Sequence, residues 1–209
     1  ASFLRGVLDY QEYRKLIANF YFVYRAMEEE ISKYHDDPAI AVIDDPVLYR
    51  TNALERDLRY YYGPNWRSIV TTTVAGQQYV NRIREVNDKM LLIGHHYTRY
   101  IGDLSGGKIV KEITARGLKP PAGKGLDFYE FPSIPDAKLF KQNYRAVLDN
   151  LGTTVPQENA LIAEANYAFE LNMNMFDEIQ GNATKSFLKL ALSYLGSFIS
   201  EMTLSKRYR

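Results

Sequence analysis

Two pairs of charged residues in this sequence have a spacing that could support chemistry. Arg99 and Asp103 stand four positions apart, so on a helix they share a face and could form an ion pair or hold a water molecule. Lys141 and Arg145 have the same spacing, and two cations on one face suit a pair of carboxylates. Ordinary solvated helix surfaces carry the same patterns, so spacing alone leaves both readings open.

The residues around Asp103 include an unusual number of glycines. Gly102 and Gly106 stand four apart, Ser105 lies beside them, and Gly107 follows. A glycine inside a helix costs roughly 0.5–1 kcal/mol relative to alanine, so these positions need a reason. One reason is a strip of bare backbone against which a flat or bulky group can lie. The alternatives are a helix that ends at Ser105 with glycines as its C-cap, or close packing of two helices.

Helices are the elements that must position these side chains. Apolar residues at steps of three and four predict helices over residues 1–34, 48–62, 75–86, 137–151 and 158–180. A further helix contains residues 93–107, and we expect Gly117 and the prolines at 120–121 to end it. Residues 122–136 read as a loop with a possible short extended piece at 128–131. No segment has convincing period-two alternation, so the predicted fold class is all-α.

Composition narrows the possible classes of protein. The 209 residues fit one domain with a substantial core. A net charge of +1 argues against a protein that mainly binds nucleic acid. The absence of cysteine excludes disulfides, iron–sulfur clusters and thiolate ligands. Seventeen tyrosines and ten phenylalanines predict a core rich in aromatic rings.

The two ends of the chain bear on membrane attachment. No signal peptide is recognisable at Ala1. Residues 187–204 are apolar, but charged residues interrupt them and the uncharged run is shorter than the roughly 20 residues of a membrane span. We therefore expect residues 183–209 to form a final packed helix of a soluble protein, with a surface-lying helix or a membrane tail as alternatives.

Several motifs resemble one known family. The run H-x-Y-T-R-Y-I-G-D-L-S-G-G at residues 95–107 resembles the distal-helix signature of the haem oxygenases. Residues 21–30, 61–66, 140–145 and 169–176 resemble stretches of the same family in the same order, and the resemblance covers residues 3 to about 182. It implies a single helical domain over residues 1–209, with haem held between a proximal helix and a distal helix that bends at its glycines.

The resemblance also implies roles for individual residues. Gly102, Ser105, Gly106 and Gly107 would contact the haem from the distal side. Asp103 would hold ordered water as a proton source, within a network that includes Arg99 and Tyr24. The remaining pocket residues would be Tyr97, Lys141 and Arg145, which would bind the haem propionates, and Phe169, Asn172 and Phe176, which would line or support the pocket.

No residue of the chain is assigned as the iron ligand. The family's proximal histidine lies upstream of the stretch that resembles residues 3–6, so we expect the proximal helix to precede Ala1. His95 matches a structural histidine of the family, and His96 stands where small residues are usual. A relative that has lost iron ligation is the alternative interpretation.

The implied reaction is oxidative opening of haem at the α-meso carbon to biliverdin, carbon monoxide and ferrous iron. Haem would be both cofactor and substrate, with O2 and with electrons from a flavoprotein reductase or ferredoxin. The sequences of residues 21–30 and 61–67 resemble most those of soluble members from photosynthetic lineages. This implies ferredoxin as the electron donor and a cytoplasmic or plastid-stromal location. A non-catalytic haem or bilin carrier and a thiaminase-like enzyme are the rivals, and the absence of cysteine disfavours the second.

Overall fold

The structure is a computed structural model that describes residues 9–179, and every regular element in that range is helical. The helices are α1 (Tyr10–Ser32), α2 (Pro38–Ala41), α3 (Thr51–Tyr62), α4 (Val74–Glu85), α5 (Lys89–His96), α6 (Gly102–Leu118), α7 (Ala137–Asp149) and α8 (Val155–Glu178). Short 3₁₀ turns occur at Pro46–Leu48, Trp66–Ser68 and Asp127–Tyr129, and a π-helical segment, Tyr97–Ile101, joins α5 to α6. The predicted all-α class is confirmed.

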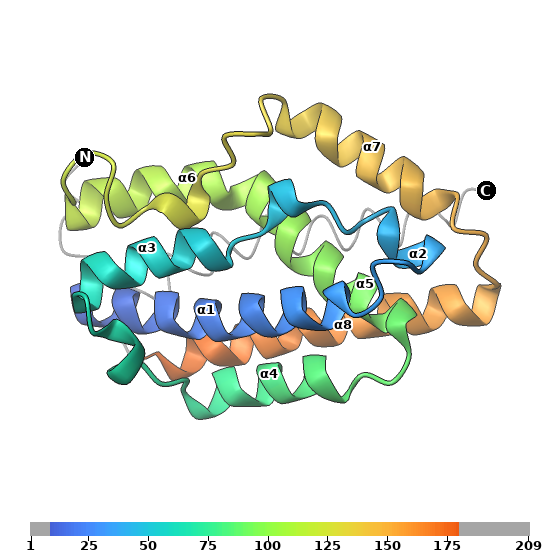
Figure 1. Ribbon diagram of the computed structural model, residues 1–209, viewed down its shortest axis with the longest axis horizontal. Helices are drawn as coiled ribbons and strands as arrows, with labels where there is room; N and C mark the ends of the chain where they lie inside the picture. Colours follow the sequence, from blue (N-terminus) through green and yellow to red (C-terminus); the bar gives the residue numbers. More distant parts are fainter. Residues whose placement is uncertain (1–8, 180–209) are drawn as a thin grey trace.

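Helix α1 is the centre of the bundle. It packs against α3 on one side and α4 on the other, and also meets α5 and α8 (Figure 1). Leu16, Phe20 and Met27 recur at helical spacing and are buried, each contributing roughly 1.5–3 kcal/mol by burial. The helix begins where the Asp9 carboxylate accepts hydrogen bonds from two free backbone N–H groups.

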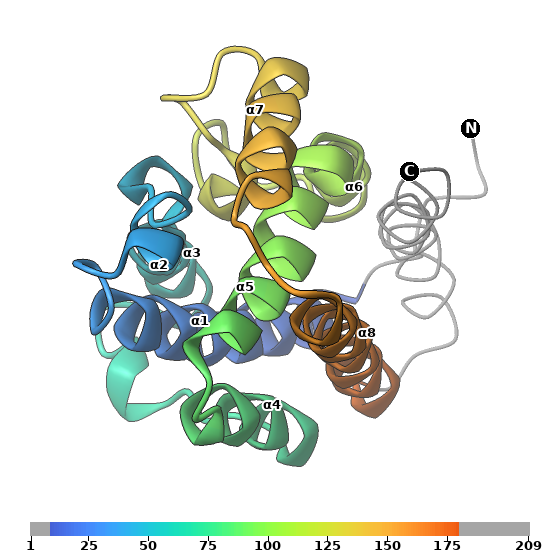
Figure 2. The ribbon, with the colours of Figure 1, turned by 90° about the vertical axis from the view of Figure 1, so that its right-hand side faces the viewer.

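Helix α8 runs beside α1 and α4 and packs closely against α5 (Figure 2). It begins with a capping box between Thr154 and Gln157. The contact with α5 requires glycine at position 94, because a Cβ atom there would lie 3.0 Å from the backbone N of Ala165 and 3.1 Å from the carbonyl O of Leu161. This close approach holds α5 against α8.

The predicted glycine-bearing helix is continuous from Lys89 to Leu118, with a change of direction near the junction of α5 and α6 (Figure 1). Gly102 has ordinary helical torsions, φ −60° and ψ −49°, and the helix passes through Gly106 and Gly107. A helix ending at Ser105 is therefore excluded. The π-helical segment, which the sequence analysis did not anticipate, is a recognised cause of such bends.

Two other segments can be compared with the predictions. Helix α6 ends at Leu118, between Gly117 and Pro120 as predicted, and is followed by Lys119 in a left-handed conformation with φ 47°. Residues 127–129 form a 3₁₀ turn where an extended piece was expected, because the Asp57 carboxylate accepts hydrogen bonds from the backbone N–H groups of Asp127 and Phe128. The predicted start of α1 before Asp9 and the helix at 183–209 lie outside the described residues.

The membrane prediction can be examined for residues 9–179. Within that range no helix is both long enough and apolar enough to cross a bilayer.

Candidate active site

Four side chains from separate segments form a buried polar network. The Tyr24 hydroxyl of α1 donates a hydrogen bond to the Asp103 carboxylate of α6. Arg99, in the π-helical segment, donates from Nε to the Tyr24 oxygen at 2.9 Å, and its Nη2 lies 3.5 Å from Oδ1 of Asp103. Arg99 also donates to the Asn172 side-chain oxygen on α8. The structure thus brings together the three predicted catalytic residues and one of the predicted pocket residues.

Burial sets the electrostatics of this network. Only 3% of Arg99 is exposed, and its guanidinium lies 4.6 Å from the centre of the Phe20 ring and 5.0 Å from that of Tyr24. Burial raises the pKa of Asp103, and the neighbouring Arg99 opposes that shift. Burial also raises the pKa of Tyr24. Asp103 therefore takes up a proton more readily than an exposed aspartate, beside a hydroxyl that stays protonated.

A second, partly buried carboxylate lies beside this network. Glu28 of α1 accepts hydrogen bonds from the Tyr100 hydroxyl at 3.0 Å and from the backbone N–H groups of Arg50 and Thr51 at 2.6 and 3.2 Å. Tyr100 also packs edge-on against Tyr24, with ring centres 5.4 Å apart. Glu28 thereby ties the start of α3 to the π-helical segment. Nothing in the local sequence distinguishes Glu28 from the two glutamates that follow it, so this role was not predicted.

The face of α6 that carries the glycines is contacted by a cationic side chain of α7. Gly102, Gly106 and Gly107 are buried, and Ser105 donates to the carbonyl of Ile101 at 2.6 Å. Lys141 Nζ of α7 in turn lies 3.0 Å from the Ser105 hydroxyl oxygen. One of the two predicted cations is therefore at the glycine strip, where the sequence alone could not place it.

Two further predicted residues lie near this contact. Arg145 is one turn beyond Lys141 on α7 and is half-buried. Tyr97 is 2% exposed, and its hydroxyl has no hydrogen-bond partner among residues 9–179. The Tyr97 ring lies near Tyr144 of α7, with ring centres 6.1 Å apart, and a hydroxyl, a lysine and an arginine form a donor set that suits carboxylates. With the bare backbone beside them, these residues fit a flat ligand that carries carboxylates, as haem does.

The predicted aromatic residues of α8 have different surroundings. Phe176 is buried and packs edge-on against Phe20 with ring centres 6.0 Å apart. Phe169 is half-buried at the edge of the core. Phe176 thus supports the ring that lies under Arg99, whereas no ring contact places Phe169 in the network.

The histidines are engaged with protein groups. His95 Nε2 lies 2.7 Å from Glu164 of α8, whose carboxylate also receives two hydrogen bonds from Arg82 of α4 at 2.8 and 2.6 Å. His96 Nδ1 lies 2.7 Å from the Tyr144 hydroxyl of α7. Among residues 9–179 no group of three or more histidine, aspartate or glutamate side chains could hold a metal ion.

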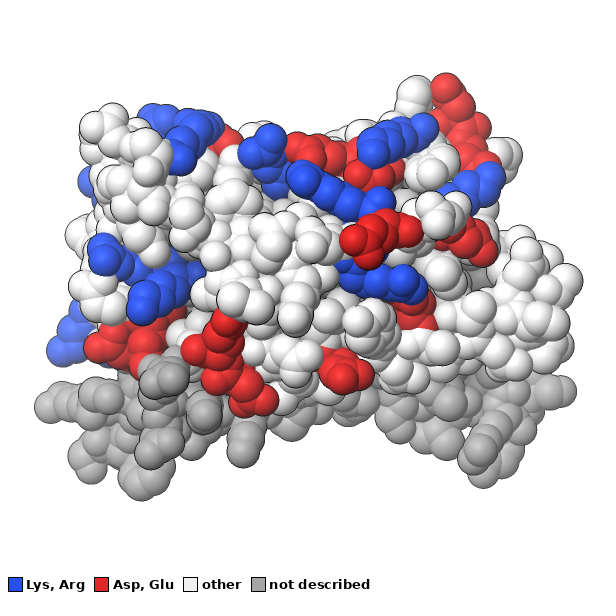
Figure 3. All heavy atoms as spheres, turned by 90° about the horizontal axis from the view of Figure 1, so that it is seen from below, with Lys and Arg blue, Asp and Glu red and all other residues white. Residues whose placement is uncertain are grey.

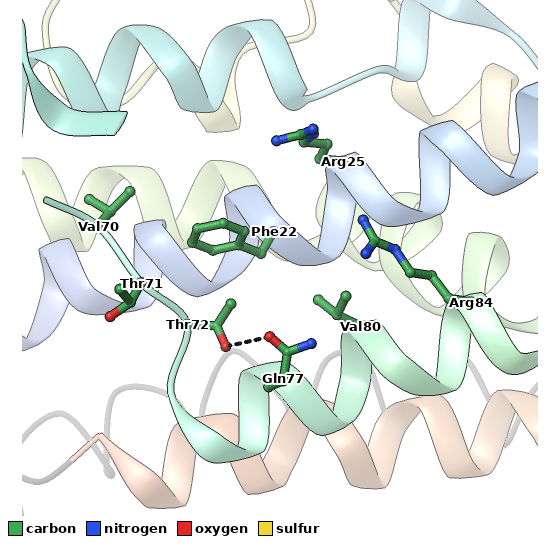
Figure 4. A pocket seen from close by; sticks show the side chains of 8 residues that line it. All are labelled: Phe22, Arg25, Val70, Thr71, Thr72, Gln77, Val80 and Arg84. Carbon is green, nitrogen blue, oxygen red and sulfur yellow. Dashed lines mark hydrogen bonds between the residues drawn. The ribbon is translucent and has the colours of Figure 1, made fainter. Parts of the chain in front are cut away.

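A groove of about 430 Å³ lies between α1 and α4, away from this network (Figure 4). Phe22 and Val80 line it, and Arg25 and Arg84 stand at its edge. Both arginines are already paired with Glu29, at 2.7 and 3.2 Å. On the face drawn in Figure 3, basic and acidic side chains are interspersed, which agrees with the nearly balanced charge.

The fold and the site together define a class: an all-helical protein with a buried acid–base network beside a bare helix face and its cations. Residues 1–178 match the family model described as "Heme oxygenase". The chain belongs to the haem oxygenase family, oxidoreductases whose reaction is the oxidative cleavage of haem to biliverdin, carbon monoxide and ferrous iron.

Individual relatives agree with this assignment. The chain is 48% identical to heme oxygenase 1 of a Nostoc strain, with 88% of this chain and 78% of that protein covered. It is 45% identical to the heme oxygenase of the red alga Porphyra purpurea, with 98% and 87% covered. The crystal structure of heme oxygenase-1 from the cyanobacterium Synechocystis in complex with heme matches with a TM-score of 0.82 at 45% identity, covering 92% of this chain and 88% of that one.

Proposed function

We propose that this chain opens haem at the α-meso carbon and that the network of Tyr24, Arg99, Asp103 and Asn172 controls the protons of the reaction. The observation that carries the proposal is the closed hydrogen-bonded network beside the glycines of α6. A general acid works best when its pKa is moved toward the working pH, and burial moves that of Asp103 in this direction.

The residues of the network and of the glycine strip have separate roles in the proposed reaction. Bound haem supplies the redox-active iron and is itself the substrate whose ring is opened. Asp103 holds water on the glycine side of α6 and passes protons through it, while Tyr24 and Arg99 fix the direction of its carboxylate. Asn172 holds Arg99 in place from α8. Without side chains on the glycine strip, a planar ring would lie directly against the backbone of α6.

The substrate's carboxylates would be held at the other edge of the strip. Lys141, which contacts Ser105, would supply one cation there, and Arg145 and Tyr97 would supply a second cation and a hydroxyl. We propose that ferredoxin or a flavoprotein reductase donates the electrons. We also propose that the protein works in the cytoplasm or the plastid stroma. The red-algal and cyanobacterial relatives support a donor from photosynthetic metabolism.

The test is turnover by the protein with its native N-terminus. Haemin is added, electrons are supplied in air, and the absorption spectrum is followed until a biliverdin band replaces that of haem. Asp103→Asn is expected to bind haem as well as the wild type but to lose at least about tenfold in rate, since general acid–base catalysis contributes about 10²–10⁴-fold.

Asp36→Asn is the matched control, because the Asp36 side chain is 92% exposed and lies in the turn after α1. Its rate should equal that of the wild type. Persistence of bound haem in the wild type under conditions where another haem oxygenase turns over would refute the oxygenase proposal. An Asp103→Asn variant with full activity would refute the role of the network alone.

A further inference from the structure

Helix α7 contacts the bundle through several side chains, of which one is buried. It lies at the edge of the molecule and is joined to its neighbours by loops at both ends (Figures 1 and 2). Of its thirteen residues, all within the described range, Tyr144 is the buried one, with 6% exposed, whereas Phe140, Val147 and Leu148 pack against the core and are only partly buried. The contacts of Tyr144 are therefore the most enclosed part of the attachment of α7.

Tyr144 contacts His96 at the end of α5. The rings are nearly parallel, with 5° between their planes and 5.6 Å between their centres, and His96 Nδ1 lies 2.7 Å from the Tyr144 oxygen. His96 is completely buried and also packs against Tyr100, at 4.5 Å between ring centres. The histidine thus contacts tyrosine rings of two separate helical segments.

Both partners of this hydrogen bond are uncharged. Burial lowers the pKa of His96 to about 3, so the ring is neutral. Burial raises the pKa of Tyr144, so its hydroxyl keeps its proton. The bond therefore joins two neutral groups near neutral pH, and the imidazole tautomer decides which of them donates.

The same residue lies between the two cations of α7. Lys141 precedes Tyr144 by three positions and Arg145 follows it directly, so all three project toward the bundle side of the helix. Lys141 reaches Ser105 on α6 at 3.0 Å. A rotation or slide of α7 around Tyr144 would move both cations relative to the glycine strip.

We propose that His96 is a positioning residue for the substrate: through Tyr144 it fixes α7, and thereby the places where Lys141 and Arg145 hold the haem carboxylates. The inference rests on the proposed role of these two cations. The haem ring is nearly fourfold symmetric and carries its carboxylates on one edge. The position of the cations therefore sets the rotation of the ring in its plane, and with it which meso carbon lies in the reactive position.

The experiment compares the distribution of biliverdin isomers and the haem dissociation constant among variants of the full-length protein. Tyr144→Phe removes the hydrogen bond and keeps the ring contact, whereas His96→Ala removes both. Each is expected to yield a mixture of isomers where the wild type yields one. Each should also raise the haem Kd about three- to tenfold, the range that corresponds to one lost hydrogen bond. The double variant should be no worse than His96→Ala, because the residues act as a pair.

Two variants separate positioning from a general loss of packing. His96→Asn places an amide oxygen near the position of Nδ1 and should restore the single isomer. Tyr49→Phe loses a tyrosine hydroxyl bond to Asp44, before α3, and should resemble the wild type in both measurements. Thermal unfolding followed by circular dichroism confirms that each variant is folded.

The possible failures are distinguishable. If Tyr144→Phe and His96→Ala are folded and both keep the wild-type isomer and affinity while Lys141→Ala changes them, His96 has no positioning role. If Lys141→Ala also changes nothing, the proposed role of the cations fails, and the inference about His96 fails with it. A wild type that binds haem without cleaving it refutes the proposed reaction, and the Kd series alone then decides whether His96 positions the ligand.

Discussion

Replacing Glu164 by glutamine should destabilise the protein through the contacts of one buried carboxylate. Glu164 of α8 holds His95 of α5 and, through two hydrogen bonds, Arg82 of α4, so three helices meet at its carboxylate. Its side chain is 6% exposed and that of His95 is fully buried, whereas a third of Arg82 is exposed. A glutamine keeps the shape but loses the charge.

The magnitude follows from the ionisation of Glu164. Burial by itself would raise its pKa, but the hydrogen bonds from His95 and Arg82 lower the pKa from 4.5 to about 2. Each pKa unit corresponds to about 1.4 kcal/mol, so the ionised form contributes about 3 kcal/mol to the free energy of unfolding near neutral pH. This agrees with the roughly 3–5 kcal/mol lost when a buried ion pair is broken, at the low end because Arg82 can turn to water.

The pH dependence provides an independent check. Because the pKa of Glu164 is lower in the folded state, its contribution is present above the unfolded pKa of 4.5 and is lost as the pH falls toward 2. The difference between wild type and Glu164→Gln should therefore shrink from about 3 kcal/mol near neutral pH to about half of that around pH 3. Urea unfolding followed by circular dichroism at several pH values measures it.

Glu29→Gln is the matched control, because Glu29 also contacts two arginines, Arg25 and Arg84, but is 42% exposed. Its loss should cost less than about 1 kcal/mol, as expected for exposed ion pairs. The reasoning is refuted if Glu164→Gln costs no more than Glu29→Gln, or if its effect is the same at low and neutral pH.

Three further substitutions test other contacts. Gly94→Ala should lower the free energy of unfolding by about 1–3 kcal/mol in urea, because its Cβ would press on α8 backbone at 3.0 Å; a neutral effect would mean that the helices separate easily. Gly107→Ala should be neutral or stabilising by up to about 1 kcal/mol in the same assay, since its Cβ would lie 3.7 Å from Tyr129, and a clear loss would contradict this. Tyr24→Phe should lower the melting temperature by an amount equivalent to about 1–3 kcal/mol, because Asp103 and Arg99 lose a buried partner, and an unchanged melting temperature would argue against the network.

The helices were largely predictable because each is specified by its own sequence. Steps of three and four between apolar residues give α1, α3, α4, α7 and α8 to within a few residues where they are described. One helix end was also predictable. Helix α6 stops at Leu118, between Gly117 and Pro120, because a proline cannot continue the helix.

The site was only partly predictable from local sequence. The pair of Arg99 and Asp103 follows from a spacing of four, and the resemblance supplied Tyr24 and Asn172. The partners His96 with Tyr144 and His95 with Glu164 are separated by 48 and 69 positions. No helical period relates residues so far apart, because their meeting depends on how the helices cross. The available signal in the sequence was the pair of adjacent histidines, His95 and His96, in a helix with apolar neighbours. This signal does not indicate which residues they contact.

Because Tyr97–Ile101 is π-helical, the site depends on the number of residues in this segment as well as on their types. A π turn contains one residue more than the α-helical path it replaces, and one residue corresponds to about 100° of rotation about the axis. Because the wider turn takes up the extra residue locally, deleting one residue there would let α5 and α6 join as a regular helix with Gly102 and Gly106 still facing nearly the same way around the axis. Substitutions in this segment change its chemistry, but a deletion would remove the π turn and with it a cause of the bend that sets the direction of α6 relative to α5.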